Sequence, residues 1–170
     1  MPKVLTSEQF IQMPWKNGKG TTLELFRINA SHSQDFEFRI SKATLSNDGP
    51  FSLFPELKRA ISILSGNGVI LNISHQKSVH LNKDSEVFIF QGHEKIDCHL
   101  NDGPCTDFNI FWNPLKFNVT FMNLPNVHTG DISFYYQLKK ETLTLFSKGE
   151  KTIEMGNHEL DGLYFQVVYK

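Results

Sequence analysis

The chain has 170 residues, 39% of them hydrophobic and 12% aromatic, with a formal net charge of −1. The 17 basic and 18 acidic residues are interspersed, and without a basic stripe a nucleic-acid-binding protein is not expected. A chain of this length buries roughly 70% of its unfolded surface, so it needs no disulfide or metal staple. No apolar run is long enough for a membrane span, and no signal peptide is seen. We therefore expect a cytoplasmic protein with both cysteines reduced.

Short strands separated by turn residues are expected along almost the whole chain. One helical turn is expected after Thr6, and Pro14 prevents it from extending far. The expected strands cover residues 22–28, 36–45, 60–64, 69–73, 78–81, 86–90, 95–100, 107–112, 117–122, 132–138, 142–146 and 163–169. Such regularly spaced short strands, with almost no helical periodicity, predict an all-β sandwich or barrel.

Two turn sequences suggest how these strands connect. Asn67 and Gly68 lie between two apolar runs, which predicts a hairpin there and a β-meander over residues 36–73. The tetrapeptide Asn-Asp-Gly-Pro occurs at 47–50 and again at 101–104, each time followed by a similar x-[Ser/Thr]-x-Phe pattern. This repetition favours two related β units in one compact molecule, with a boundary at roughly residues 90–105.

A polar strand face is the first candidate for a binding site. Side chains alternate along a strand, so Arg39 and Ser41 share one face of their strand, and Asp107 and Asn109 share one face of theirs. The planar guanidinium of arginine matches the two oxygens of a carboxylate. The residues expected to contact a ligand are Arg39, Ser41, Arg59, Asp107 and Asn109. The alternative is that both arginines form structural ion pairs with Asp48 or Asp107.

The loop before the first long strand is the second candidate. Its glycines and small polar residues allow close approach of the backbone to another surface. We expect Trp15, Asn17 and Thr21 to lie near the rim of the ligand site. The alternative is an ordinary turn entering a strand, with Trp15 as a core residue.

Several segments, in order, resemble the HutD/Ves family of small bicupin proteins. The matching segments are residues 15–18, 20–21, 38–41 with Ala43, 48–52, 54–55, Arg59, 64–66, 102–104 and 107–109. The chain departs from the family pattern at Lys19, at Glu56 and over residues 110–114. The resemblance implies two cupin-like jelly-roll β-barrels in one chain and a cytoplasmic protein linked to histidine utilisation. It also implies that a small acidic ligand, such as urocanate or formylglutamate, binds without a metal in a regulatory role.

The sequence gives less support for a catalytic site than for a binding site. Enzymatic cupins usually hold a metal with an H-x-H pair, and none of the seven histidines forms one. We therefore expect no metal, no other cofactor and no catalytic residues, and we lean toward a protein that is not an enzyme. A metal-dependent cupin isomerase or oxygenase remains the alternative, supported only by the implied fold.

A third hypothesis is an interaction module. The aromatic run at residues 134–136 could form an exposed sheet edge that supports a homodimer. The alternative is that this run is packed in the interior. A small carboxylate remains the main expected partner, with neither nucleic acid nor a membrane among the others.

Overall fold

The computed structural model describes residues 1–15, 20–31, 35–74, 76–123, 127–151 and 161–170. Over these ranges it contains fifteen β-strands, one short 3-10 turn and no α-helix, which confirms the all-β prediction. The turn, η1 (Ser7–Gln9), begins with a capping box between Thr6 and Gln9, as expected for a single helical turn. None of the helical structure in these ranges has the length and apolar character needed to cross a membrane.

The chain forms two compact units that do not follow the expected boundary. The central unit is Ile11–Pro114, and the terminal unit combines Met1–Phe10 with Leu115–Lys170. The chain therefore divides later than residues 90–105, because β10 (Ile96–Leu100) and β11 (Cys105–Trp112) pair with strands of the central unit. Both Asn-Asp-Gly-Pro turns lie in the central unit as well, so the repeat does not mark two units.

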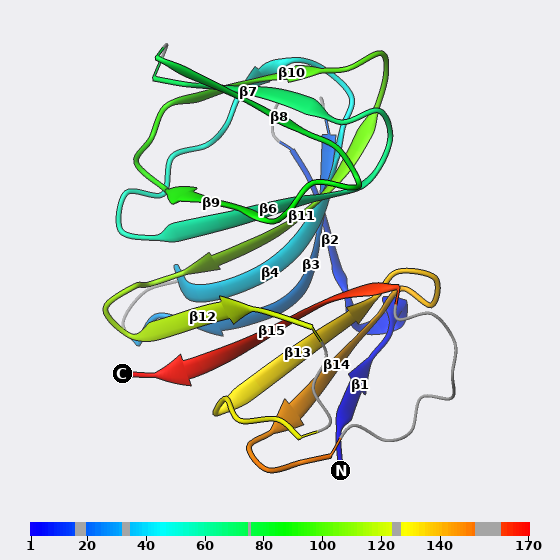
Figure 1. Cartoon of the computed structure of the whole chain (residues 1–170), viewed down its shortest axis with the longest axis vertical. Helices are drawn as coiled ribbons and strands as arrows, with labels where there is room; N and C mark the ends of the chain where they lie inside the picture. The colour runs from blue at the N-terminus through cyan, green and yellow to red at the C-terminus, as the bar shows by residue number, and fades with distance from the viewer. Residues whose placement is uncertain (16–19, 32–34, 75, 124–126, 152–160) are drawn as a thin grey trace. The chain divides into compact units, whose positions relative to one another are not determined.

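The central unit contains a six-stranded antiparallel sheet (Figure 1). Its strands, in spatial order, are β2 (Ile11–Pro14), β3 (Gly20–Asn29), β4 (Phe36–Leu45), β11, β6 (Lys58–Ser65) and β9 (Phe88–Gln91). The strand β4 has the bounds that alternation predicted, since large apolar residues alternate with polar or small ones along it. β11 lies between β4 and β6, although 59 residues separate it from β4 in the sequence and 39 separate it from β6.

A four-stranded sheet completes the central unit. Its strands, in spatial order, are β5 (Gly49–Pro50), β10, β7 (Val69–Ile73) and β8 (Lys77–Leu81). The predicted meander is wrong, because β4 and β6 are separated by β11 and because β7 pairs with β8 and β10. The turn at Asn67 and Gly68 instead carries the chain from one sheet to the other.

The glycines of this turn explain why it passes between sheets. Gly66 and Gly68 have φ angles of 87° and 90°, which only glycine adopts readily. A Cβ atom at Gly66 would lie 2.4 Å from the carbonyl oxygen of Pro104, and one at Gly68 would lie 2.1 Å from that of Leu81. The turn is therefore held against two other segments, and these tertiary contacts override the local hairpin signal.

Residues from both sheets share one hydrophobic core in the central unit. Leu45, Ile61 and Ile63 come from the six-stranded sheet, and Leu71 and Ile96 come from the four-stranded sheet. Cys98 and Cys105 are free thiols buried in the same cluster. This core occupies only part of the central unit. Polar side chains such as Ser41 and Asn109 lie on the same six-stranded sheet and line a cavity.

The terminal unit is built on one five-stranded antiparallel sheet. Its strands, in spatial order, are β1 (Lys3–Leu5), β14 (Thr142–Ser147), β13 (Ile132–Gln137), β15 (Gly162–Tyr169) and β12 (Phe117–Phe121). The aromatic run Phe134, Tyr135 and Tyr136 lies on the interior strand β13, where each residue is at most 2% exposed. The prediction of an exposed aromatic edge is therefore wrong, and the homodimer stays a prediction without that support.

Candidate functional site

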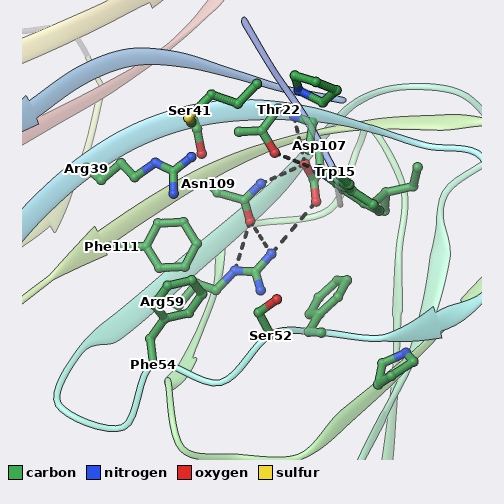
Figure 2. A pocket seen from close by; sticks show the side chains of 16 residues that line it. Trp15, Thr22, Arg39, Ser41, Ser52, Phe54, Arg59, Asp107, Asn109 and Phe111 are labelled. Carbon is green, nitrogen blue, oxygen red and sulfur yellow. Dashed lines mark hydrogen bonds and ion pairs between the residues drawn. The ribbon is translucent and has the colours of Figure 1, made fainter. Parts of the chain in front are cut away.

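A cavity of about 490 Å³ lies within the central unit (Figure 2). Its volume falls within the range typical of small-molecule sites. The polar and charged residues lining it are Thr22, Arg39, Ser41, Ser52, Arg59, Asp107 and Asn109. The aromatic residues lining it are Trp15, Phe51, Phe54 and Phe111. Polar groups that converge on a cavity with aromatic walls can orient a small ligand there.

Strand pairing places the polar residues side by side. In the register of β4 and β11, Ala43 lies opposite Asp107 and Ser41 lies opposite Asn109. Residues that lie opposite each other in antiparallel strands project to the same face of the sheet. The two polar faces predicted from alternation therefore form one continuous surface, and both line the cavity.

A buried hydrogen-bond network fixes Arg59 beside this surface. Its Nε and Nη2 groups donate to Oδ1 of Asn109 at 2.9 and 2.6 Å. The Nδ2 group of Asn109 donates in turn to Oδ1 of Asp107 at 2.6 Å, and the backbone N–H of Ala43 donates to the same oxygen at 3.2 Å. The side-chain carbonyl of Asn109 thus accepts from the Arg59 cation and its amide nitrogen donates to the Asp107 anion, which fixes the orientation of the side chain.

The Arg59 guanidinium is surrounded by aromatic rings. Its Cζ atom lies 4.2 Å from the ring centroid of Phe51, 5.0 Å from that of Phe111 and 5.4 Å from that of Phe90. Burial lowers the pKa of Arg59 to about 10, and the charge of Asp107 opposes this effect. Arg59 therefore remains a cation at neutral pH, and the rings stabilise that charge without using its N–H groups.

Arg59 keeps hydrogen-bond donors available toward the cavity. A guanidinium has five N–H donors, and two of those of Arg59 are used by Asn109. The other three have no hydrogen-bond partner among the residues that the structure describes. The Nη2 atom does form an ion pair with Asp107, whose Oδ2 atom lies 4.0 Å away. A planar cation held in place with free donors is suited to bind an oxyanion.

Asp107 is the buried anion of the network. It is 0% exposed, and burial raises its pKa to about 6, while Arg59 and the hydrogen bond from Asn109 act in the opposite direction. Arg59 therefore does pair with Asp107, as the structural alternative expected. Asp48 does not serve this role, since it binds His99 and the backbone N–H of Leu100.

Arg39 has a different anionic partner. Its Nε atom lies 2.9 Å from Oε2 of Glu24 on β3, and Glu24 is only 6% exposed. Burial lowers the pKa of Arg39, whereas Glu24 raises it. The guanidinium also lies 5.2 Å from the ring of Phe36 and 6.0 Å from that of Phe111. Arg39 thus brings a second, more exposed cation to the same cavity wall.

The structure brings most of the expected site residues together. Arg39, Ser41, Arg59, Asp107, Asn109 and Trp15 all line the cavity. Thr21 is not among the lining residues; its neighbour Thr22 lines the cavity and accepts a hydrogen bond from Nε1 of Trp15 at 2.8 Å. Asn17 lies outside the described residues.

Sequence reasoning missed two parts of the site. The aromatic wall at Phe51 and Phe54 follows the Asn-Asp-Gly-Pro turn at residues 47–50, so the turn motif was a usable signal. Glu24 lies on a strand that alternation did predict, but nothing in the local sequence distinguishes this buried acid from the exposed ones. Among the described residues, no group of three or more His, Cys, Asp or Glu side chains is arranged to hold a metal ion.

Comparison with known sequences gives a consistent set of relatives. A model of the HutD family matches residues 7–163. A Pseudomonas putida protein, described as an uncharacterized 21.2 kDa protein in the hutC 3' region, is 33% identical over 115 residues, or 68% of this chain. Protein Ves of Escherichia fergusonii is 33% identical over 97 residues, or 56% of this chain. The matches cover 60% and 50% of these relatives, so the chain spans little more than half of their length.

Solved structures share the fold over nearly the whole chain. HutD from Pseudomonas fluorescens SBW25 superposes with a TM-score of 0.82 at 20% identity, covering 100% of both chains. A conserved protein of unknown function from Pseudomonas aeruginosa PAO1 has a TM-score of 0.76 at 23% identity, covering 99% of this chain and 93% of its own. At these identities the likeness shows the fold alone. The jelly-roll and bicupin details stay predictions.

Proposed function

Because the chain belongs to the HutD family, we propose that it binds a small carboxylate in the cavity beside Arg59 and acts as a regulator in histidine catabolism. The observation that carries this proposal is the Arg59 guanidinium, which is fixed by Asn109 and retains donors toward a cavity of about 490 Å³. Two of these donors match the two oxygens of a carboxylate. Candidate ligands are urocanate and formylglutamate.

Arg39 supports the same proposal from the opposite side of Phe111. Both arginines line the cavity, and each already has a carboxylate partner close by, Glu24 for Arg39 and Asp107 for Arg59. These partners stabilise the buried cations when the cavity is empty, which lowers the cost of keeping two charges there. A ligand carboxylate then adds hydrogen bonds to cations that are already in place.

The link to histidine catabolism in this proposal rests on one relative. The Pseudomonas putida relative carries a description that places it in the hutC 3' region. We extend this association to the present chain as part of the proposal. The hydrogen bonds of Asn109 and the charge of Asp107 hold the Arg59 cation in place, which favours binding over catalysis.

Calorimetric titration with urocanate, formylglutamate, glutamate and other small dicarboxylates tests the proposal. Arg59→Met removes the cation and is expected to raise the Kd of the binding acid roughly 30- to 1,000-fold, or about 2–4 kcal/mol. Arg59→Lys keeps a charge beside Asp107 but loses the planar fork, and a rise of at least about tenfold is expected.

The matched control is Lys58→Met. Lys58 is the preceding residue on β6 and does not line the cavity, so its loss removes a charge without touching the site. Its affinity should equal that of the wild type. Equal affinity in a folded Arg59→Lys variant, or no binding of any acid by the wild type, would overturn the proposal.

A further inference from the structure

One oxygen of Asp107 has no hydrogen bond within the described part of the chain. Oδ1 accepts hydrogen bonds from Asn109 and from the backbone of Ala43, whereas Oδ2 accepts none. The nearest cation, Nη2 of Arg59, lies 4.0 Å from Oδ2, which is too far for a hydrogen bond. Figure 2 shows this oxygen turned toward the Arg59 guanidinium. A fully buried carboxylate oxygen without a donor is costly and needs an explanation.

Two of the surrounding N–H donors are already in use. The indole N–H of Trp15 donates to Thr22, and the amide nitrogen of Asn109 donates to the other oxygen of Asp107. Asp107 itself lines the cavity. A molecule in the cavity that carries a donor would therefore complete the hydrogen bonding of Oδ2.

We propose that the cavity selects carboxylates that carry a hydrogen-bond donor on the neighbouring atom, with the carboxylate on Arg59 and the donor on Oδ2 of Asp107. This inference rests on the proposed function, since it assumes that a carboxylate binds Arg59. The separation of 4.0 Å between Nη2 and Oδ2 requires the acceptor and the donor of the ligand to be close neighbours. Acids with an α-amido, α-amino or α-hydroxy group, or with a ring N–H beside the carboxylate, meet this requirement. Of the two candidate ligands, formylglutamate has an α-amido N–H and meets it, whereas urocanate has no donor beside its carboxylate.

The same geometry rejects ligands with an acceptor at that position. A lone pair of a ring oxygen, a keto oxygen or a second carboxylate would face the unbonded oxygen of Asp107. The ligand would then lose one hydrogen bond to a charged group and gain a repulsive contact. The expected discrimination is roughly 10- to 100-fold in Kd, the effect of one hydrogen bond to a charged group.

The test compares pyrrole-2-carboxylate with furan-2-carboxylate on the full chain by calorimetry at pH 7.5. The two acids have the same ring size and charge, and they differ in an N–H donor against an oxygen acceptor. We expect the pyrrole acid to bind at least about tenfold more tightly. Lactate and pyruvate form a second pair, an α-hydroxy against an α-keto acid, for which lactate should bind more tightly.

Asp107→Asn supplies the decisive variant. Asn109 and Ala43 both donate to the inner oxygen of residue 107, so the amide of the variant should direct its carbonyl inward and its NH₂ toward the cavity. The preference should then reverse, with the furan acid binding more tightly than the pyrrole acid. If this variant does not fold, the two ligand pairs on the wild type decide the question.

The outcomes separate this inference from the proposed function. The wild type could bind both members of each pair equally, with that binding lost in Arg59→Lys. This result would overturn the role of Asp107 and leave carboxylate binding intact. It is the result expected if a water molecule donates to Oδ2. Tighter binding of the furan acid or pyruvate by the wild type would overturn the role of Asp107 as well. Failure of these acids and of the whole panel of carboxylates to bind would overturn the proposed function, and this inference with it.

Discussion

The two units of the molecule differ in the charged side chains that they bury. The central unit buries an ion pair, Arg59 with Asp107, beside a cavity. The terminal unit buries aromatic residues such as Phe134 and Phe165, whose stacked rings have centroids 5.2 Å apart. A buried ion pair is generally no more stabilising than apolar residues of similar volume. The terminal unit is therefore stabilised by apolar packing, whereas Arg59 and Asp107 of the central unit line the cavity proposed to bind a ligand.

Removing an aromatic ring from the terminal unit should give the largest loss of stability. Phe165 is 0% exposed, and Phe165→Ala is expected to lower the free energy of unfolding by about 3–5 kcal/mol. Chemical denaturation measures this loss. The control is Val168→Ala on the same strand, which should have little effect because Val168 is 39% exposed. Carboxylate affinity should be unchanged in both folded variants. A change in affinity for Phe165→Ala would contradict the division of roles between the units.

The pH dependence of stability should identify the buried carboxylate of the central unit. The pKa of Asp107 is raised from 3.8 to about 6 in the folded state, so the folded chain binds more protons than the unfolded chain between these values. Stability from this group is therefore fully present below pH 3.8 and is lost as the pH rises through about 6. Relative to Asp107→Asn, the wild type should lose roughly 3 kcal/mol over this range.

Neighbouring groups should not obscure this measurement. Arg59 and the thiols of Cys98 and Cys105, which face Asp107, have pKa values of about 10, 12 and 11, so they keep their charge state between pH 4 and 7. Arg39 also remains protonated there. Denaturation at several pH values measures the difference, and Asp84→Asn, at an exposed aspartate, is the control. A pH-independent difference between wild type and Asp107→Asn would contradict the raised pKa.

The smallest expected effect concerns a polar contact in the terminal unit. His128 is 1% exposed, stacks on Phe146 at 3.8 Å between centroids, and shares a hydrogen bond of 3.0 Å between its Nδ1 atom and the hydroxyl of Tyr164. Tyr164→Phe should lower the free energy of unfolding by about 1 kcal/mol and leave ligand affinity unchanged. Thermal unfolding with and without the bound acid measures both. A loss of binding would show that the terminal unit takes part in recognition.

Alternation along strands allowed much of the site to be predicted. The faces of β4 and β11 were predicted correctly because a strand fixes the direction of its side chains, and Arg39, Ser41, Asp107 and Asn109 all line the cavity. The strand β4 has the predicted bounds for the same reason, and β7 has the bounds that its short apolar run predicted. Such predictions depend only on the local sequence pattern.

Pairing between distant strands could not be predicted in this way. The insertion of β11 between β4 and β6 depends on contacts across more than forty residues, and no local turn signal reports it. The same limitation explains the wrong meander and the missed role of Glu24, which matters only because β3 lies beside β4. The short strands β1, β2 and β5 were missed because they have three, four and two residues, which is too few to show a periodic pattern.

The pairing of β1 with β14 has a consequence for folding during synthesis. Lys3 pairs with Leu145, and about 140 residues separate them, so at 5–20 residues per second β1 waits roughly 7–30 s for its partner to leave the ribosome. The central unit, by contrast, is one continuous stretch that contains every strand of its two sheets. We therefore expect the nascent chain to complete the cavity first, while β1 remains unpaired until β14 has been synthesised.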